Sequence, residues 1–297
     1  MYREERLLAP AKVNLCLRVV GRRTDGYHLL DSLMVPISLY DELTVKVGSA
    51  ARGADPEQSI RVSSDSGNAP GGPTNLAYRA AAMFLTRVKR AVSVDIDLRK
   101  RIPVGSGLGG GSSDGAAVLL ALNRLLGGPL ATAELGELGA QIGADVTFFV
   151  HGCPARVQGV GERITPLSLP CRLSLVICWD GYSLSTQLVY SRVNVSLTRP
   201  AGVSNILEFV SGHGLSPELL VNDLEEAAAQ IHPEVLSLKA RLMKEGAVGA
   251  LMTGSGAAVF GVWRDLESAR NAAILLRQLG LWAEPVETLA MSPVVGC

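Results

Sequence analysis

The chain has 297 residues, and its 28 lysines and arginines balance its 28 aspartates and glutamates, so its formal net charge at pH 7 is zero. A chain of this length can bury a sizeable core and holds about two domains. Because there is no basic surplus, we expect no nucleic-acid partner and no anionic membrane surface, although a balanced total still allows a local basic patch.

The cysteines and the first residues favour a reduced compartment. The five cysteines are Cys16, Cys153, Cys171, Cys178 and Cys297. Their number is odd and they form no Cys-x-x-Cys pair, which argues against a secreted disulfide framework. The opening MYREERLLAPAK lacks the apolar core of a signal peptide, and no apolar run reaches the roughly 18 residues of a membrane-spanning helix. We therefore expect a cytoplasmic protein, and no pattern in the sequence requires an obligate protein partner.

The first half of the chain shows two strand patterns, a loop and a helix, followed by a third strand. Residues 11–20 alternate as a strand, and residues 41–47 form a second, short strand. Residues 63–75 are rich in Ser, Gly and Pro and predict a loop, after which a helix should begin near Asn75. Residues 93–103, SVDIDLRKRIP, alternate as a half-buried strand that stops at its proline.

The second half mixes helices and strands in an irregular order. The predicted elements are a helix over 132–143 ended by Gly143, a central strand over 173–179, two helices within 216–246 parted near His232, two strands around a glycine turn within 247–263, a helix over 266–280 and a last strand over 281–289. Without a strict βαβ period, this order predicts an α+β fold. Two prolines in TPLSLPCR place a domain boundary there, giving domains 1–165 and 166–297.

A glycine-rich segment, RIPVGSGLGGGSSDGAAVLLALNRLL at residues 101–126, runs directly into an apolar helix. The first turn of a helix carries unpaired N–H groups and the positive end of the helix dipole. Glycines let the backbone approach an anion closely, and Ser112 and Ser113 add hydroxyl donors or a Mg²⁺ ligand. The segment therefore predicts a cradle for the phosphates of a nucleotide.

Other glycine-loop types fit this segment less well. The P-loop pattern fails because no lysine precedes Ser112. Residues 105–110 match G-x-G-x-x-G, but a dinucleotide fold also requires a strand running straight into the first glycine and an acidic residue about 20 positions later. The remaining alternative is a tight loop whose glycines serve packing only, for which one or two glycines would suffice.

The stretch GLGGGSSDGAA resembles the Pro-x-x-x-Gly-Leu-Gly-(Gly)-Ser-Ser-x-x-Ala loop of the GHMP kinases. Four more segments match that family in its own order, and together they span residues 10–260: PAKVNLCLRVVGRRTDGYH, GADVTFF, GVGE and LMTGSGAAVF. The resemblance implies a two-domain α+β fold with the active site in the cleft between the domains. It also implies ATP, arriving with Mg²⁺, as the donor of a phosphoryl group to an alcohol.

Within the family, PAKVNL together with DGYH and GADV is typical of members that phosphorylate the 2-hydroxyl of a cytidylyl-linked methylerythritol, for the non-mevalonate route to isoprenoid precursors. The resemblance thus implies a small cytidylyl molecule as the second substrate. Two alternatives stay open, namely a kinase for another small alcohol such as mevalonate or homoserine, and a non-catalytic nucleotide-binding relative.

The resemblance implies catalytic roles for Lys12 and Asp145. A carboxylate beside the acceptor hydroxyl can take its proton, and an ammonium group can keep that carboxylate ionised or neutralise the transferring phosphoryl group. Local sequence alone indicates less specific roles. Asp145 would be a capping or turn aspartate between a helix and a strand, and Lys12 an outward lysine on a strand.

Five residues match the family's substrate site. Tyr27 and His28 match the cytosine site, where a ring stacks on the base and an imidazole bonds its edge. Tyr190 would cover the other face of the base, Thr186 would lie near the acceptor end, and Asn14 shares the strand face of the catalytic lysine. The alternative for each tyrosine is a half-buried anchor.

Asn75 and Lys100 match positions on the adenine side, but Asn75 could equally be a helix N-cap and Lys100 a solvated charge. The loop residues implied to bind ATP are Pro103, Val104, Gly105, Ser106, Gly107, Leu108, Gly109, Gly110, Gly111, Ser112 and Ser113. Residues 254–256 form a second glycine turn, which the family places against the cleft and which could otherwise be a hairpin turn. His151 and Cys153 lack further ligand spacing, so we expect no metal site there.

Overall fold

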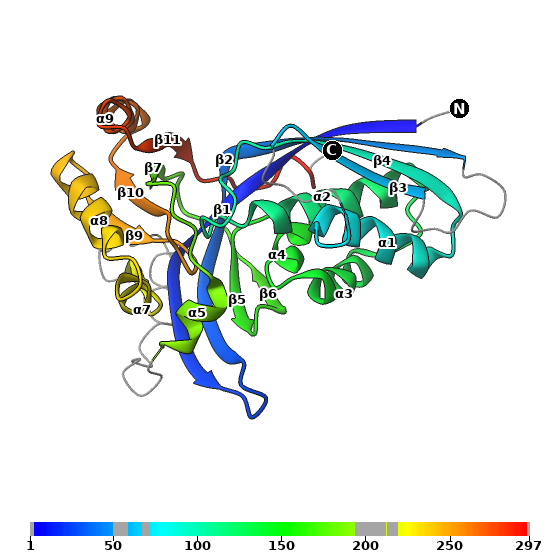
Figure 1. Cartoon of the computed structure of the whole chain (residues 1–297), viewed down its shortest axis with the longest axis horizontal. Helices are drawn as coiled ribbons and strands as arrows, with labels where there is room; N and C mark the ends of the chain where they lie inside the picture. The colour runs from blue at the N-terminus through cyan, green and yellow to red at the C-terminus, as the bar shows by residue number, and fades with distance from the viewer. Residues whose placement is uncertain (1–2, 50–58, 67–71, 194–211, 213–218, 296–297) are drawn as a thin grey trace.

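The computed structural model describes residues 3–49, 59–66, 72–193, 212 and 219–295. Cys297, residues 67–71 of the predicted loop and residues 216–218 of the predicted helix lie outside these ranges. Two groups of elements lie at opposite ends of the molecule, and one long hairpin runs between them (Figure 1). The mixture of helices and mainly antiparallel sheets confirms the predicted α+β class.

The hairpin consists of β1 (Arg3–Arg22) and β2 (His28–Ser49), which pair antiparallel along nearly their whole length. The prediction of a separate short strand over 41–47 is therefore wrong in extent. Residues 31–37 of β2 are all buried, so this part of the strand carries no alternation of apolar and polar residues. Alternation of apolar and polar residues, on which the prediction rests, occurs only in the part of β2 that follows residue 37.

The first sheet has the order β3-β4-β2-β1-β8, and β5 and β6 extend it from β2. Its further strands are β3 (Ile60–Ser64), β4 (Val92–Arg99), β5 (Ala155–Gly159), β6 (Arg163–Pro166) and β8 (Val221–Asn222). The helices of this end are α1 (Leu76–Val88), α2 (Gly110–Leu125), α3 (Thr132–Ile142) and α4 (Val146–His151). The start of α1 after Asn75 and the end of α3 at Gly143 are as predicted.

The second sheet is antiparallel and has the order β11-β7-β10-β9. Its strands are β7 (Ser174–Trp179), β9 (Gly249–Met252), β10 (Val259–Trp263) and β11 (Trp282–Glu287). The helices of this half are α5 (Thr186–Ser191), α7 (Glu225–Ala229), α8 (Glu234–Lys244) and α9 (Leu266–Gln278). The interior place of β7 confirms the central strand that its continuous apolar run predicts.

The two halves share strands, which bears on the predicted domain boundary. β6 crosses the position between residues 165 and 166, and β8, from the later part of the chain, pairs with β1 in the first sheet. The boundary stays a prediction. The four described cysteines are free thiols, and no helix in the described ranges is long and apolar enough to cross a membrane.

Candidate active site

The two residues with predicted catalytic roles lie side by side. Lys12 projects from β1 and Asp145 precedes α4, and Lys12 Nζ is 3.6 Å from Asp145 Oδ2. The lysine side chain is 4% exposed, whereas the aspartate side chain is 33% exposed. Lys12 is therefore not an outward strand lysine, and the carboxylate of Asp145 reaches solvent beside a buried positive charge.

The carboxylate of Asp145 is not used by its own helix. Asp145 is the N-cap residue of α4, with φ −88° and ψ −7°, and its side chain makes no capping hydrogen bond. A capping aspartate would accept a hydrogen bond from a backbone N–H of the first turn. The segment that follows is a short helix and not the strand that the local sequence suggests, and the carboxylate is left available to a ligand.

Lys12 is held in place by a chain of buried hydrogen bonds. Its Nζ donates to Asn14 Oδ1 (2.7 Å), Asn14 Nδ2 donates to Ser32 Oγ (2.8 Å), and Ser32 Oγ donates to the Cys16 carbonyl (2.6 Å). The N–H of Gly254 donates to the same Asn14 Oδ1 (3.1 Å). Asn14 thus positions the lysine, and its predicted contact with substrate stays a prediction.

The glycine-rich loop turns its carbonyl groups toward the surrounding protein. Three loop carbonyls accept from donors outside the loop: Val104 from Ser183 Oγ (3.1 Å), Ser106 from the N–H of Ala258 (3.0 Å) and Leu108 from the N–H of Lys12 (3.0 Å). Within the described ranges, the N–H groups of residues 104–112 donate no hydrogen bond. Residues 110–112 form the first turn of α2, where free N–H groups and the helix dipole favour an anion, and residues 104–109 lead into it.

The glycines of this loop also serve packing. Gly107 and Gly109 have φ of +85° and +75°, in the left-handed region that favours glycine. A Cβ on Gly107 would lie 2.5 Å from the Thr253 carbonyl oxygen, and one on Gly109 would lie 3.0 Å from the Phe149 ring. Packing therefore explains part of the glycine content, and it fixes the backbone whose N–H groups stay free.

The second glycine turn is fixed by Asn222 of β8. Its Nδ2 donates to the carbonyls of Met252 and Gly254, both at 2.8 Å, and its Oδ1 accepts from the N–H of Leu224 (3.0 Å). β8 pairs parallel with β1, where Asn222 lies opposite Leu17. The sequence prediction missed Asn222, because a strand of two residues has no periodicity and the predicted helix covered it.

The predicted cytosine site is more open. Tyr27 is 65% exposed, while the rings of His28 and Tyr190 lie 5.2 Å apart at 33°. Partial burial and the nearby charge of Arg22 lower the pKa of His28, which favours the neutral imidazole at pH 7. Burial, and to a smaller degree the charge of Asp145, raise the pKa of Tyr190 above its ordinary value.

Thr186, the first residue of α5, lies against the second glycine turn. Its Oγ1 shares a hydrogen bond of 2.8 Å with Ser255 Oγ. The structure thus places this predicted acceptor-end residue beside the turn whose Gly254 contacts Asn14. Its contact with a substrate remains a prediction.

The two predicted adenine-side residues have internal partners. Asn75 caps α1 by accepting from the N–H of Ala77 (2.8 Å).

Lys100 is 6% exposed and bonds the carboxylates of Asp41 and Asp114, so it is not a solvated charge. Burial alone would lower the pKa of Lys100, but the two carboxylates raise it. Burial raises the pKa of Asp114 to about 7 against the effect of Lys100, with Asp41 adding to the rise. The ATP contacts of Asn75 and Lys100 stay predictions.

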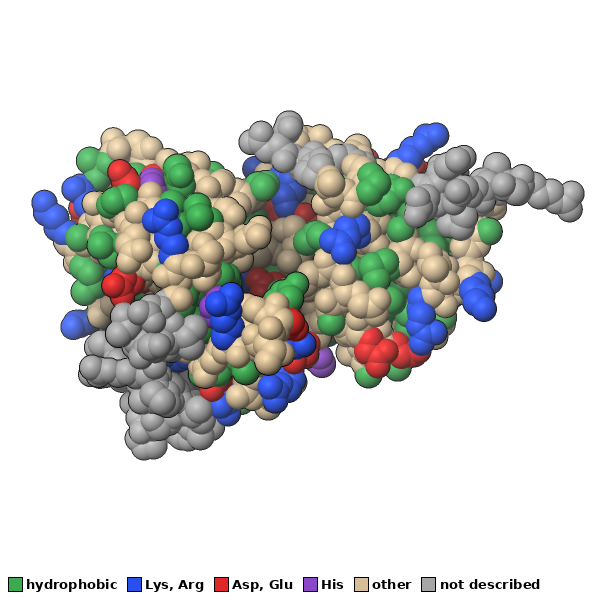
Figure 2. Space-filling view, turned by 60° about the horizontal axis from the view of Figure 1, so that its bottom comes forward, with side chains coloured by type: hydrophobic (Ala, Val, Ile, Leu, Met, Phe, Trp, Pro, Cys, Tyr) green, Lys and Arg blue, Asp and Glu red, His purple; other side chains and the backbone are tan. Residues whose placement is uncertain are grey.

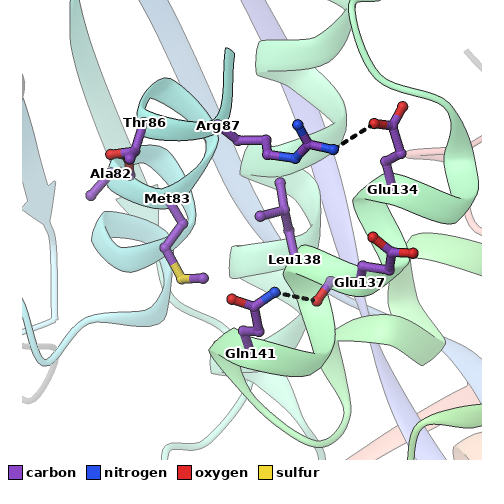
Figure 3. Close-up of a pocket in the computed structure, with 8 residues that line it drawn as sticks. All are labelled: Ala82, Met83, Thr86, Arg87, Glu134, Glu137, Leu138 and Gln141. Carbon is purple, nitrogen blue, oxygen red and sulfur yellow. Dashed lines mark hydrogen bonds and ion pairs between the residues drawn. The ribbon is translucent and has the colours of Figure 1, made fainter. Parts of the chain in front are cut away.

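The surface is hollowed between the two ends of the molecule, with an acidic side chain at the floor (Figure 2). A separate pocket lies between α1 and α3 (Figure 3). Its lining residues are Ala82, Met83, Thr86, Arg87, Glu134, Glu137, Leu138 and Gln141, none of which is a predicted site residue. Among the described residues, no group of three or more His, Cys, Asp and Glu side chains could hold a metal ion.

Family models and relatives agree on one family. The models described as "GHMP kinases N terminal domain" and "GHMP kinases C terminal" match residues 75–153 and 209–274. A protein of Citrifermentans bemidjiense named 4-diphosphocytidyl-2-C-methyl-D-erythritol kinase is 41% identical over 284 residues, which cover 95% of this chain and 98% of that protein. A protein of Syntrophotalea carbinolica with the same name is 40% identical over 98% of this chain and 99% of its own length.

Solved structures agree with the family models and the relatives. A crystal structure of 4-(cytidine 5'-diphospho)-2C-methyl-D-erythritol kinase has a TM-score of 0.80 and 40% identity, covering 97% of this chain and 99% of its own. Homoserine kinase from Cytophaga hutchinsonii has a TM-score of 0.74 over 98% of this chain and 96% of its own, but at 18% identity it shares the fold alone. The chain belongs to the GHMP kinases, in the family of the 4-diphosphocytidyl-2-C-methyl-D-erythritol kinases.

Proposed function

We propose that this protein transfers the γ-phosphoryl group of ATP to the 2-hydroxyl of 4-diphosphocytidyl-2-C-methyl-D-erythritol, giving the 2-phosphate and ADP. The observation that carries the reaction type is the Lys12–Asp145 pair beside a loop whose N–H groups are free. The acceptor is inferred from relatives at 40–41% identity over nearly the full chain. The activity would serve isoprenoid precursor synthesis in the cytoplasm, a location supported by the cysteine pattern.

Asp145 would act as the general base of the transfer. Its carboxylate takes the proton of the acceptor hydroxyl while the hydroxyl oxygen bonds to the γ-phosphorus and the bond from phosphorus to the leaving oxygen of ADP breaks. Lys12, at 3.6 Å, supplies a positive charge that offsets the charge of the carboxylate and of the transferring group. The buried hydrogen bonds from Asn14 hold the ammonium there before substrate arrives.

ATP would lie along residues 103–113, with its phosphates on the free N–H groups at the start of α2. Mg²⁺ enters as part of this substrate, because it binds phosphate oxygens readily and needs few protein carboxylates. Asn75, which caps the first turn of α1, would lie on the adenine side of this arrangement.

The cytidylyl substrate would place its base at the open end of the site. Tyr27 stacks on one face, Tyr190 covers the other, and neutral His28 offers one donor and one acceptor to the edge of the base. Thr186 and Asn14 lie toward the acceptor hydroxyl. The exposure of Tyr27 leaves this end accessible to a small molecule.

An ADP-release assay of the purified protein tests the proposal against three acceptors: the cytidylyl-methylerythritol substrate, mevalonate and homoserine. We expect kcat/KM to be highest for the cytidylyl compound by at least 100-fold. A higher value for mevalonate or homoserine would identify a kinase for another alcohol. Binding of ATP without ADP release from any acceptor would support a non-catalytic nucleotide-binding protein.

A further inference from the structure

A buried cluster of three charged side chains lies at the base of the glycine-rich loop. Asp41 comes from β2, Lys100 follows β4, and Asp114 lies in α2, and their side chains are 0%, 6% and 4% exposed. Lys100 Nζ bonds Asp114 Oδ2 at 2.6 Å and also bonds Asp41 Oδ2. The proposed reaction uses none of these three groups directly.

The contacts of Asp41 lie at the entry to the loop. Its Oδ1 accepts from the N–H groups of Arg101 (2.6 Å) and Ile102 (2.9 Å), the two residues before Pro103. Through Lys100, Asp41 is also tied to Asp114, which lies just past the exit from the loop. The carboxylate of Asp41 therefore connects the segment before the loop with the segment after it.

Close packing between the same two segments supports this connection. A Cβ on Gly110, the first residue of α2, would lie 2.9 Å from Ile102 Cγ2 and 3.2 Å from Asp41 Oδ2. The entry and the exit are thus in contact without room for another side chain. The loop that carries the free N–H groups of residues 104–112 is therefore closed at its base.

The burial of the cluster indicates a purpose other than stability. Removing charges from water costs several kcal/mol per ion, and well-packed apolar residues would often serve stability as well. In some proteins, buried ionic groups instead fix a particular geometry, because each partner must stay within bonding distance. The geometry that this cluster fixes is the distance between the two ends of the loop.

We propose that Asp41, Lys100 and Asp114 are positioning residues for ATP, which hold the two ends of the glycine-rich loop so that its N–H groups are ready for the phosphates. The proposal rests on the proposed use of ATP. It also replaces a direct contact of the Lys100 side chain with adenine, because that ammonium group is buried and already bonded to two carboxylates.

Two aspartate-to-asparagine variants make a matched pair. Asp41 uses both oxygens, so an amide would turn its NH₂ group toward either Lys100 or the backbone donors and break one connection. Asp114 bonds only through Oδ2, and its Oδ1 has no partner. The variant Asp114→Asn therefore makes the same chemical replacement, a carboxyl group by an amide, while an amide oxygen continues to accept from Lys100.

Binding of the non-hydrolysable analogue adenylyl imidodiphosphate, measured by calorimetry on folded protein, tests the proposal. We expect Asp41→Asn to weaken binding at least tenfold and to raise KM for ATP while KM for the acceptor stays within twofold. Asp114→Asn should change both nucleotide values less than threefold. A folded Asp41→Asn variant with wild-type affinity overturns the proposal, as does an equal loss in the two variants.

Hydrogen exchange on the wild-type protein provides a second test if Asp41→Asn does not fold. The amides of Arg101 and Ile102 should be protected before nucleotide is added, whereas those of residues 104–112 should exchange quickly and gain protection with the analogue. Fast exchange at Arg101 and Ile102 without nucleotide overturns the proposal. If the wild-type protein does not bind the analogue, the proposed function itself is overturned. If wild type and variant bind it equally well, only the positioning role of the cluster is overturned.

Discussion

The two ends of the candidate site are built differently. At the reaction end, Lys12 and Asn14 are each 3% exposed and bonded to each other, and the second glycine turn bonds Asn14 from the opposite side. At the cytosine end, Tyr27 is 65% exposed, and the rings of His28 and Tyr190 face each other. Lys12 and Asn14 are thus held by buried hydrogen bonds, whereas Tyr27, one of the residues proposed to recognise the base, is largely exposed.

The spacing of the rings shows what the open end must do. A flat base between two rings needs about 7 Å between their centres, because each contact takes about 3.5 Å. His28 and Tyr190 lie 5.2 Å apart, so the base cannot enter between them as they stand. This spacing agrees with the proposed position of the base between Tyr27 and Tyr190, with His28 at its edge.

The largest effect should come from Asp145→Asn, which removes the proposed base from the fixed end. We expect kcat to fall by on the order of 10²-fold or more, because an amide cannot take the proton of the hydroxyl. Binding of adenylyl imidodiphosphate should stay near the wild-type value. Near-normal turnover in a folded variant would show that the rigid end does not carry the chemistry.

The next effect should come from Tyr27→Ala at the open end. Loss of a stacking ring costs about 1–3 kcal/mol per base, so KM for the cytidylyl substrate should rise about tenfold while KM for ATP is little changed. Tyr27→Phe keeps the ring and should remain close to wild type in both constants. An equal rise of KM for the two substrates would argue against the stacking role.

A smaller effect is expected from Asn222→Ala, because Asn222 contacts the second glycine turn and not the reacting groups themselves. The variant leaves the carbonyls of Met252 and Gly254 without their buried donor, at a cost of about 1–3 kcal/mol in the free energy of unfolding. Because Gly254 supports Asn14, kcat should also fall about fivefold. Thermal unfolding and kinetics together test this, and lost stability with unchanged kcat would show that Lys12 does not depend on the turn.

The sequence predicted the parts of this arrangement that have a local signature. The glycine loop, the N-cap at Asn75 and the interior strand β7 each follow from neighbouring residues. The meeting of Lys12 and Asp145, 133 positions apart, followed only from resemblance, since no periodicity links them. Asn222 and Asp41 were missed, because a buried polar residue within a strand becomes meaningful only when its partners are known.

The free N–H groups could not be derived from the sequence either. The glycine count suggested either an anion cradle or tight packing, and the structure shows tight packing together with backbone N–H groups that make no hydrogen bond. Gly107 packs its missing Cβ position against Thr253, and the carbonyl groups on either side of it bond to outside donors. That combination depends on elements from both halves of the chain.

A further prediction concerns the pH dependence at the open end. Burial and Arg22 lower the pKa of His28 below 6.5, so the neutral ring persists until the pH falls below that value. Protonation then removes the ring's acceptor, and KM for the cytidylyl substrate should rise about threefold between pH 7 and pH 5.5. In His28→Asn, KM for the cytidylyl substrate should change between these two pH values no more than KM for ATP does. A rise that begins above pH 7 would contradict the lowered pKa.

The smallest effect should come from Arg87→Ala in the pocket between α1 and α3. Arg87 Nη2 lies 2.8 Å from Glu134 Oε1, and the two side chains are 50% and 36% exposed, so the pair contributes at most about 1 kcal/mol. We expect kcat and both KM values to stay within twofold of wild type, because no proposed site residue lines this pocket. Glu134→Ala should behave in the same way, apart from a small further loss of stability because Glu134 also bonds the N–H of Ala131. If either variant changes KM for one substrate by more than twofold, α1 or α3 affects the geometry of the site. The division between a buried reaction end and an exposed base end would then be too simple.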